Sequence, residues 1–85
     1  MICCVYIIES VRGIWYYGYS ADPDRRLIEH NSGRNVSTRG RGPWQLIFKR
    51  KFEDQTDAIR FEKLLKKTRN KKYIYAAYKK YFIAS

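Results

Sequence analysis

The first twenty residues contain two apolar runs separated by a short polar interval. Residues 1–8 are apolar, β-branched or aromatic, and residues 14–19 are again rich in aromatic side chains. Runs of this length and composition are typical of strands. Residues 9–13 lie between the runs and contain Gly13, which favours a turn. The pattern therefore predicts two strands, over 1–8 and 14–19, that pair as an antiparallel hairpin.

A polar interval with the signals of a helix start follows the hairpin. Asp22 belongs to the residue types that cap helices, and Pro23 fits the first helical turn because an N–H there would have no partner. Ser32 and Gly33 form a stop signal, so we expect a helix from Pro23 to about Asn31. Residues 34–42 contain three arginines and two glycines. We expect them to form a basic loop that does not pack.

The second half of the chain predicts one strand and two helices. Residues 43–52 alternate as in a strand, and residues 56–68 repeat apolar side chains at helical spacing. Residues 70–72 interrupt that repeat, and residues 73–83 are expected to form a last helix. The predicted order is β-β-α-β-α-α within one domain over residues 1–85, an α+β fold with a three-stranded antiparallel or mixed sheet flanked by helices. The alternation on the strand is imperfect, as expected where both faces are partly covered: Trp44, Leu46, Phe48, Arg50 and Phe52 alternate with Gln45, Ile47, Lys49 and Lys51. The apolar residues of the helix are Ala58, Phe61, Leu64 and Leu65.

The charge of the chain indicates a polyanionic partner. Eighteen basic residues face eight acidic ones, which gives a net charge of +10, and 45% of the residues are hydrophobic, which favours a folded protein. Residues 63–85 contain eight basic side chains and no acidic one. A folded chain this basic most often binds nucleic acid.

Cysteine usage and hydropathy restrict the environment. Cys3 and Cys4 are adjacent on a predicted strand, so their side chains should point to opposite faces and cannot easily pair. With no other cysteine, neither a disulfide framework nor a cysteine zinc site is available. The first apolar run is too short for a signal peptide, and no run approaches membrane-spanning length. We expect an intracellular protein, in cytoplasm or nucleus, with no membrane partner.

Five side chains combine chemistry with a convergent expected position. The hairpin can bring the phenols of Tyr6 and Tyr16 to one surface, and Arg26 and His30 are four residues apart on one helix face. Glu62 interrupts the apolar repeat of the next helix. Four of them also have a structural interpretation: tyrosines in strands are usually core residues, a lone histidine is usually a hydrogen-bonded structural group, and Glu62 could form a surface pair with Lys66.

Five ordered blocks of the sequence carry a family resemblance that covers residues 4 to about 68. The chain resembles the GIY-YIG nuclease superfamily, in particular its small stand-alone members, which are related to the nuclease domains of excision-repair and branched-DNA-resolving enzymes. Residues 22–33 are similar to the family segment Asp-x-x-Arg-Arg-Leu-x-x-His-Asn-x-Gly, and Arg26 follows Tyr16 by ten positions, as in the family. The other blocks are Val5-Tyr6-Ile7, Tyr16-Tyr17-Gly18, Thr38 with Gly42-Pro43-Trp44, and Ala58-Ile59-Arg60-Phe61-Glu62-Lys63. The chain departs from the family pattern at Tyr19, where some members have lysine, and at Ile74, where many have asparagine.

The resemblance implies a DNA endonuclease that hydrolyses phosphodiester bonds with one divalent metal ion. Glu62 would bind Mg²⁺ or Mn²⁺, and Arg26 would stabilise the charge that develops on the phosphate. Tyr6 would act as general base and Tyr16 would position the water or the phosphate. His30 would accept a proton from, or hydrogen-bond to, Tyr6 or the water.

The resemblance and the charge together predict contacts with DNA, either branched or flapped, in repair or recombination. A single site predicts a nick rather than a double cut, while the oligomeric state and any protein partner stay open. The main alternative is a catalytically inactive module that only binds nucleic acid, and a second alternative is a cationic protein of the membrane surface. The residues expected to contact DNA are Arg25, Arg34, Thr38, Arg39, Arg41, Lys63, Lys66 and Lys67.

Overall fold

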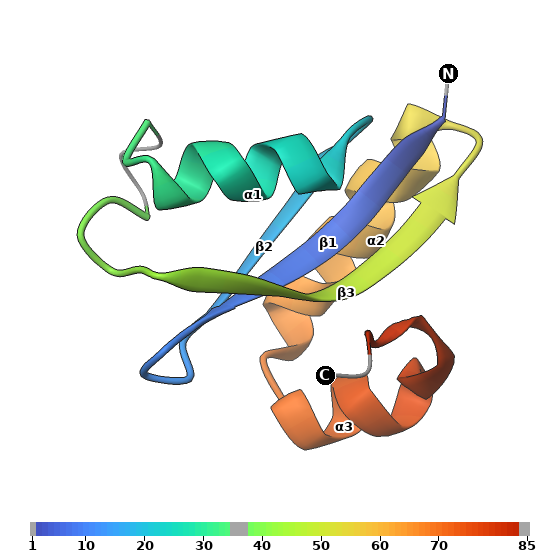
Figure 1. The fold of residues 1–85 in the computed structure, drawn as a ribbon. Helices are drawn as coiled ribbons and strands as arrows, with labels where there is room; N and C mark the ends of the chain where they lie inside the picture. The colour runs from blue at the N-terminus through green and yellow to red at the C-terminus, as the bar shows by residue number, and fades with distance from the viewer. Residues whose placement is uncertain (1, 35–37, 84–85) are drawn as a thin grey trace.

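The computed structural model describes residues 2–34 and 38–83, and it confirms the predicted α+β fold. The three strands form one antiparallel sheet in the order β2-β1-β3, so the first strand lies in the centre. The helices follow in the predicted β-β-α-β-α-α order (Figure 1). The elements are β1 (Cys3–Ser10), β2 (Trp15–Ser20), α1 (Pro23–Asn31), β3 (Trp44–Phe52), α2 (Gln55–Thr68), α3 (Lys71–Ala77) and a final 3-10 turn, η1 (Lys79–Tyr81).

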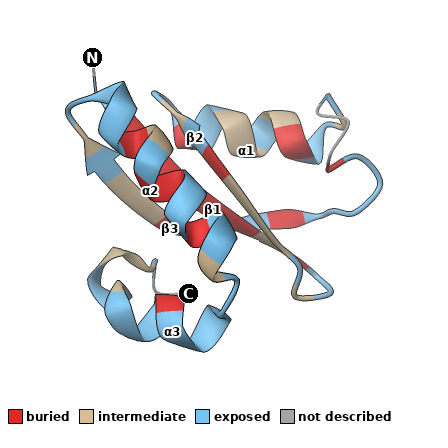
Figure 2. Ribbon diagram, turned by 180° about the vertical axis from the view of Figure 1, so that it is seen from behind, coloured by how far each residue is buried: buried red, intermediate tan, exposed pale blue. Residues whose placement is uncertain are grey.

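The central strand β1 supplies both hydrophobic cores, because helices cover both faces of the sheet. Its odd-numbered side chains, such as Val5 and Ile7, pack with α2 and α3, on what we call the α2 face. Tyr6 and Ile8 point the other way and pack with α1, on the α1 face. Figures 1 and 2 show α1 and α2 on opposite sides of the sheet. Burial on both faces explains why residues 3–8 form a continuous apolar run.

A β-bulge divides β3 between the two faces. Ile7 lies opposite Phe48 but Ile8 lies opposite Leu46, so Ile47 is an extra residue in the ladder. Trp44 and Leu46 consequently pack on the α1 face, whereas Phe48 packs on the α2 face. The alternation predicted for residues 43–52 is imperfect because the extra residue reverses it halfway along the strand, which places Trp44 and Phe48 on opposite faces.

Helix α2 buries a glutamate where a leucine was expected. The prediction of a helix over 56–68 is confirmed, with Asp54 as the N-cap that accepts a hydrogen bond from the Thr56 backbone N–H at 2.9 Å. Leu64, however, is 48% exposed, and Glu62 is only 8% exposed. The buried stripe therefore follows the spacing i, i+3, i+4, i+7 and contains one carboxylate among three apolar residues: Ala58, Phe61, Glu62 and Leu65.

The last helix starts and ends earlier than the sequence predicted. Asn70 caps α3 by accepting a hydrogen bond from the Tyr73 backbone N–H at 3.0 Å, so the helix begins at Lys71 instead of Tyr73. It ends at Ala77 because the chain then turns back to the sheet. Phe82 forms a bridge with Phe48, and the Ile83 N–H donates to the Ile47 carbonyl at 2.8 Å. The predicted helix over 73–83 was thus wrong beyond residue 77.

The two cysteines are both buried and free, as expected for adjacent residues of the central strand. Cys3 belongs to the core of the α2 face. Burial raises the pKa of both thiols, which makes them poor nucleophiles near neutral pH. Within the ranges 2–34 and 38–83, no helix has the length and apolar content to span a bilayer.

The C-cap residue that follows α2, Arg69, offers a test of the backbone geometry. Arg69 ends the helix with φ 52°, a left-handed conformation that favours glycine. The substitution Arg69→Gly is expected to raise the free energy of unfolding, measured with urea, by about 0.5–1 kcal/mol. The matched substitution Arg60→Gly, at an exposed position inside α2, should lower it by about 1 kcal/mol. Destabilisation by Arg69→Gly would contradict this backbone assignment.

Candidate active site

Four of the five predicted catalytic side chains line one cleft, although they come from four different elements. Tyr6 comes from β1, Tyr16 from β2, Arg26 from α1 and Glu62 from α2. The cleft has a volume of about 420 Å³ and is completed by Gly18, Tyr19 and Ser20 of β2. We call it the Tyr6 cleft. The fifth predicted residue, His30, lies behind Tyr6 and does not line the cleft.

Gly18 creates the space that Tyr6 occupies. The two residues are paired across β1 and β2, so their side chains share one face of the sheet. A Cβ atom at residue 18 would lie 2.6 Å from the Tyr6 hydroxyl oxygen and 2.7 Å from its Cζ, well inside van der Waals contact. The glycine of the Tyr-Tyr-Gly block is therefore required because the Tyr6 ring lies directly over the neighbouring backbone.

A buried hydrogen-bond chain connects the cleft to the loop after α1. The Tyr6 hydroxyl lies 2.9 Å from His30 Nε2, and His30 Nδ1 lies 2.8 Å from Thr38 Oγ1. Tyr6 and Thr38 are each 1% exposed and His30 is 2% exposed. Because a neutral imidazole donates at one nitrogen and accepts at the other, this chain can exist in two proton arrangements.

Burial keeps the Tyr6 phenol and the His30 imidazole neutral near pH 7. Desolvation raises the pKa of Tyr6, and the neighbouring Arg26 guanidinium opposes that change by hydrogen bonding and by its charge. Desolvation also lowers the pKa of His30, and the positive charge of Arg26 lowers it further. A neutral imidazole next to a neutral phenol is able to accept a proton from it.

Arg26 is held between the cleft and a carboxylate that sequence reasoning missed. Its Nη1 donates to Glu29 Oε1 at 2.5 Å, and Arg25 Nε lies 3.3 Å from the other Glu29 oxygen. The hydrogen bond with Tyr6 is the largest cause that raises the pKa of Arg26, followed among the favourable contacts by the bond with Glu29. Arg26 in turn lowers the pKa of Glu29. The i, i+3 spacing of Arg26 and Glu29 was the available signal.

Asn31 is a second residue that sequence reasoning left without a function. Its side-chain amide donates to the Trp44 carbonyl at 3.1 Å and accepts from the Trp44 backbone N–H at 2.6 Å. The Trp44 indole then donates to the Thr38 carbonyl at 3.2 Å. Asn31 thereby ties the end of α1 to the start of β3 and supports the position of Thr38 next to His30.

Glu62 forms the predicted pair with Lys66, but it does so at the Tyr6 cleft. Its Oε1 forms the i, i+4 pair with Lys66 at 3.2 Å, but the carboxylate is nearly buried and lines the Tyr6 cleft instead of an exposed helix surface. Within the part of the chain that the structure describes, no three His, Cys, Asp or Glu side chains gather as a ready metal cage. One carboxylate in an open cleft fits a hard divalent ion that keeps several waters and binds a substrate phosphate.

Most of the predicted DNA-contact residues are exposed, with one exception. Thr38 is buried against His30, so its side chain cannot reach a phosphate, and the prediction of a DNA contact there was wrong. Arg39 is exposed and its Nε donates to the Gly33 carbonyl at 2.9 Å. The remaining exposed members of the set are Arg25, Arg34, Arg41, Lys63, Lys66 and Lys67.

The two departures from the family pattern have different structural settings. Tyr19 is partly exposed and contributes to the wall of the Tyr6 cleft. Ile74 is completely buried in the core of the α2 face. Residue 74 therefore stabilises the packing of α3 and does not belong to the cleft.

A family model for the GIY-YIG catalytic domain matches residues 2–76 of the chain. This range contains every residue of the Tyr6 cleft and the buried chain behind it. The match ends just before the C-terminal residue of α3.

The chain is also similar to several proteins of a family called UPF0213. It is 46% identical over 59 residues to the UPF0213 protein BH0048 of Halalkalibacterium halodurans, an alignment that covers 68% of this chain and 63% of that protein, less than two thirds of its length. A UPF0213 protein of Streptococcus agalactiae is 40% identical over 84% of this chain and 83% of its own length. The solution structure of BH0048, from Bacillus halodurans, superimposes with a TM-score of 0.59 and 38% identity, and covers 92% of this chain and 86% of that one.

The lowered pKa of His30 predicts a pH dependence of stability. The unfolded chain takes up a proton at this residue near pH 6.5, whereas the folded protein does so only at lower pH. The free energy of unfolding should therefore decrease as the pH falls below about 6.5, and His30→Gln should weaken this dependence. Because His30 is the only histidine, NMR titration reads its pKa directly. A value at or above 6.5 would refute the buried, neutral assignment, and Arg26→Ala should raise it.

The substitution Gly18→Ala tests the close approach of Tyr6 to β2. The added methyl group should displace the Tyr6 hydroxyl, break its hydrogen bond with His30 and shift the His30 ring ¹⁵N signals. Gly13→Ala is the control in the same hairpin: at φ 82° it strains the turn and should lower stability, but its Cβ has no atom within 4 Å, so the His30 signals should stay unchanged. Identical His30 spectra for the wild type and Gly18→Ala would show that Tyr6 does not lie against residue 18.

Proposed function

Because this chain belongs to the GIY-YIG family, whose domain has a nuclease fold and a nucleic-acid substrate, we propose that it is a metal-dependent DNA endonuclease. The observation that supports this most strongly is the convergence of two phenols, a guanidinium and a carboxylate in the Tyr6 cleft. The product of the proposed reaction is a nicked strand, since the chain offers one such cleft within its described residues.

In this proposal Arg26 binds the scissile phosphate. Its guanidinium presents planar donors that match phosphate oxygens, and Glu29 holds it in one orientation. The charge on the phosphate increases as the nucleophile attacks, so a fixed cation stabilises the transition state more than the ground state. Tyr16, which also lines the cleft, orients the phosphate or the attacking water through its hydroxyl.

Tyr6 and His30 together remove a proton from the attacking water. A neutral Tyr6 cannot accept a proton unless it loses its own, and His30 Nε2 lies 2.9 Å away as a neutral acceptor. As the water oxygen forms its bond to phosphorus, the water proton passes to the Tyr6 oxygen and the Tyr6 proton passes to Nε2. For this transfer His30 must carry its other proton on Nδ1, which then donates to Thr38 Oγ1. The bond from phosphorus to the 3′ oxygen breaks, and that oxygen leaves with the bonding electrons and takes a proton from solvent. His30 then returns its extra proton to solvent through Tyr6, which restores both neutral groups.

Glu62 would hold one Mg²⁺ or Mn²⁺ ion in this cleft. When bound, such an ion polarises the phosphate and stabilises negative charge on the leaving oxygen. Glu62 is nearly buried and lies 3.2 Å from the Lys66 ammonium, at a position where its carboxylate lines the cleft.

The proposed substrate is DNA with a branch, flap or nick, and its cleavage would serve DNA repair or recombination. The wild type is therefore expected to cut flaps, forks or four-way junctions faster than plain duplex of the same sequence.

The activity itself is tested with supercoiled plasmid and Mg²⁺ or Mn²⁺, with and without chelator. The wild type should convert the plasmid to the open-circular form only with metal. Arg26→Ala and Glu62→Gln should each lower the rate at least about 100-fold, because the first removes the cation that contacts the reacting phosphate and the second removes the carboxylate that would hold the metal ion. Arg12→Ala and Glu53→Gln, which change the same residue types at exposed positions outside the cleft, should cut like the wild type.

The main alternative function predicts a different result in the same assay. A nucleic-acid-binding module without catalysis would retard DNA in a gel yet leave the plasmid supercoiled with either metal. Equal behaviour of the wild type, Arg26→Ala and Glu62→Gln would likewise rule out the enzyme.

A further inference from the structure

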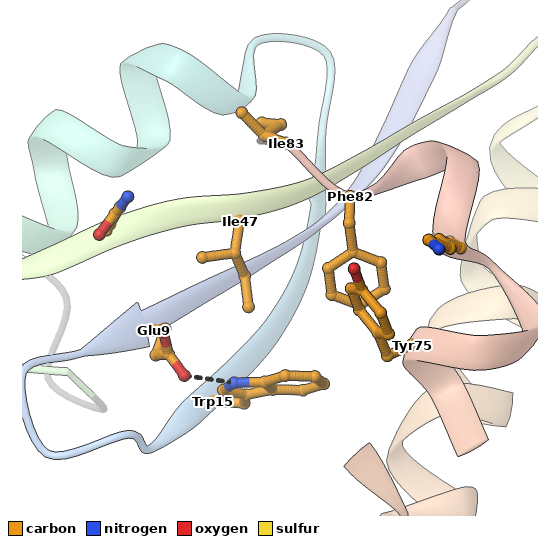
Figure 3. Close-up of a pocket in the computed structure, with 8 residues that line it drawn as sticks. Glu9, Trp15, Ile47, Tyr75, Phe82 and Ile83 are labelled. Atoms are coloured by element: carbon orange, nitrogen blue, oxygen red, sulfur yellow. Dashed lines mark hydrogen bonds between the residues drawn. The ribbon is translucent and has the colours of Figure 1, made fainter. Parts of the chain in front are cut away.

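A second cavity lies on the α2 face and is not used by the proposed mechanism. It has a volume of about 540 Å³, larger than the Tyr6 cleft. Side chains from the end of β1, the start of β2, β3 and the C-terminal segment meet there (Figure 3). We call it the Trp15 groove. Its aromatic and aliphatic lining includes Trp15, Ile47, Tyr75 and Phe82, and Glu9 and Lys79 are its charged residues.

The aromatic rings of the groove are only partly covered by other protein atoms. Phe82 lies 5.0 Å from the Tyr75 ring and 5.9 Å from the Trp15 ring, between centroids. Tyr75 nevertheless remains 49% exposed. Exposed aromatic faces at an open cavity are a platform on which nucleic-acid bases stack, each base contributing substantially to the affinity.

The charges around the groove favour an anionic ligand. Lys79 lines it, and the Lys71 ammonium lies 5.2 Å from the centroid of the Trp15 ring and donates to the Gly13 carbonyl. The one acidic side chain in the lining, Glu9, accepts a hydrogen bond from the Trp15 indole at 2.9 Å. A carboxylate held next to an aromatic face is suited to accept from the exocyclic amino group of a stacked base.

We propose that the Trp15 groove binds unpaired bases of a single-stranded arm of the DNA substrate. Paired bases in a duplex do not present their faces, so the stacking surface selects single strands. Trp15 and Tyr16 are adjacent in β2 and point to opposite faces of the sheet. The strand in the groove is therefore a different segment from the one at the scissile phosphate. This inference rests on the proposed function and specifies its substrate as a duplex with a single-stranded arm, such as a flap or fork.

The proposal is tested by binding without cleavage, with chelator present and a fluorescently labelled single-stranded oligonucleotide. Tyr75→Ala should weaken binding about tenfold, because it removes one stacking surface. Tyr73→Ala is the matched control: it lies on the same short helix, is 57% exposed and does not line the groove. Lys79→Ala should also weaken binding more than Lys72→Ala, which removes an equal charge outside the groove.

Tryptophan fluorescence provides a second measurement that does not depend on these variants. The chain has two tryptophans: Trp15 in the groove and Trp44, which is buried on the α1 face. The oligonucleotide should quench the wild-type emission, and Trp15→Phe should abolish most of that quenching. Duplex DNA of the same length should quench much less.

The results separate failure of this inference from failure of the proposed function. Equal affinities for Tyr75→Ala and Tyr73→Ala, or no quenching of Trp15, would overturn the groove as a binding site even if the wild type cuts plasmid. Loss of single-strand binding in Tyr75→Ala would support the groove even if no variant cuts. If the protein does cut, Tyr75→Ala should reduce kcat/KM for a flap but not for a nicked duplex without an arm, and an equal reduction for both would overturn the proposal.

Discussion

The candidate site depends on one buried hydrogen bond, between the Tyr6 hydroxyl and His30 Nε2. It joins the central strand to α1 across the α1 face of the sheet, and both side chains are almost inaccessible to solvent. Thr38 completes the chain on one side, and Gly18 makes room for the phenol on the other. An unpaired buried hydroxyl or imidazole would be costly, so each of these residues depends on its neighbours. The same bond that stabilises the packing provides the proposed proton path.

Glu62 shows the same combination of packing and chemistry on the other side of the cleft. A carboxylate at a position of the buried stripe of α2 is a local conflict, since charged groups lose hydration there. Lys66 offsets part of that cost. The other buried positions of this stripe are apolar, which makes Glu62 a candidate functional residue. Because residue 62 is buried and residue 64 is not, the carboxylate lies in the lining of the cleft.

The sequence predicted those features that local signals control. The hairpin, the capped helix α1 and the α2 helix follow from apolar periodicity, Asp22, Pro23 and the turn at Gly13, and their order was sufficient for the fold class. The bulge at Ile47 was not predictable in this way, because an extra residue becomes visible only when the strand is paired with β1. Leu64 was predicted to be buried because of its hydrophobicity. The helical spacing of Ala58, Phe61 and Leu65 instead favours burial of residue 62. Thr38 was taken for a surface residue since its neighbours are basic and polar, but its hydroxyl has its partner inside the protein.

In our proposal Glu62 would hold a divalent ion beside Tyr6 and Arg26, and paramagnetic NMR tests this placement without relying on catalysis. Substoichiometric Mn²⁺, added to ¹⁵N-labelled protein with a short non-cleavable oligonucleotide, broadens signals near the bound ion. We expect selective broadening of the Gly18 amide and the Arg26 side chain in the wild type, and loss of that broadening in Glu62→Gln. Broadening that is centred elsewhere, or that is the same in Glu62→Gln, would contradict binding of the ion by Glu62.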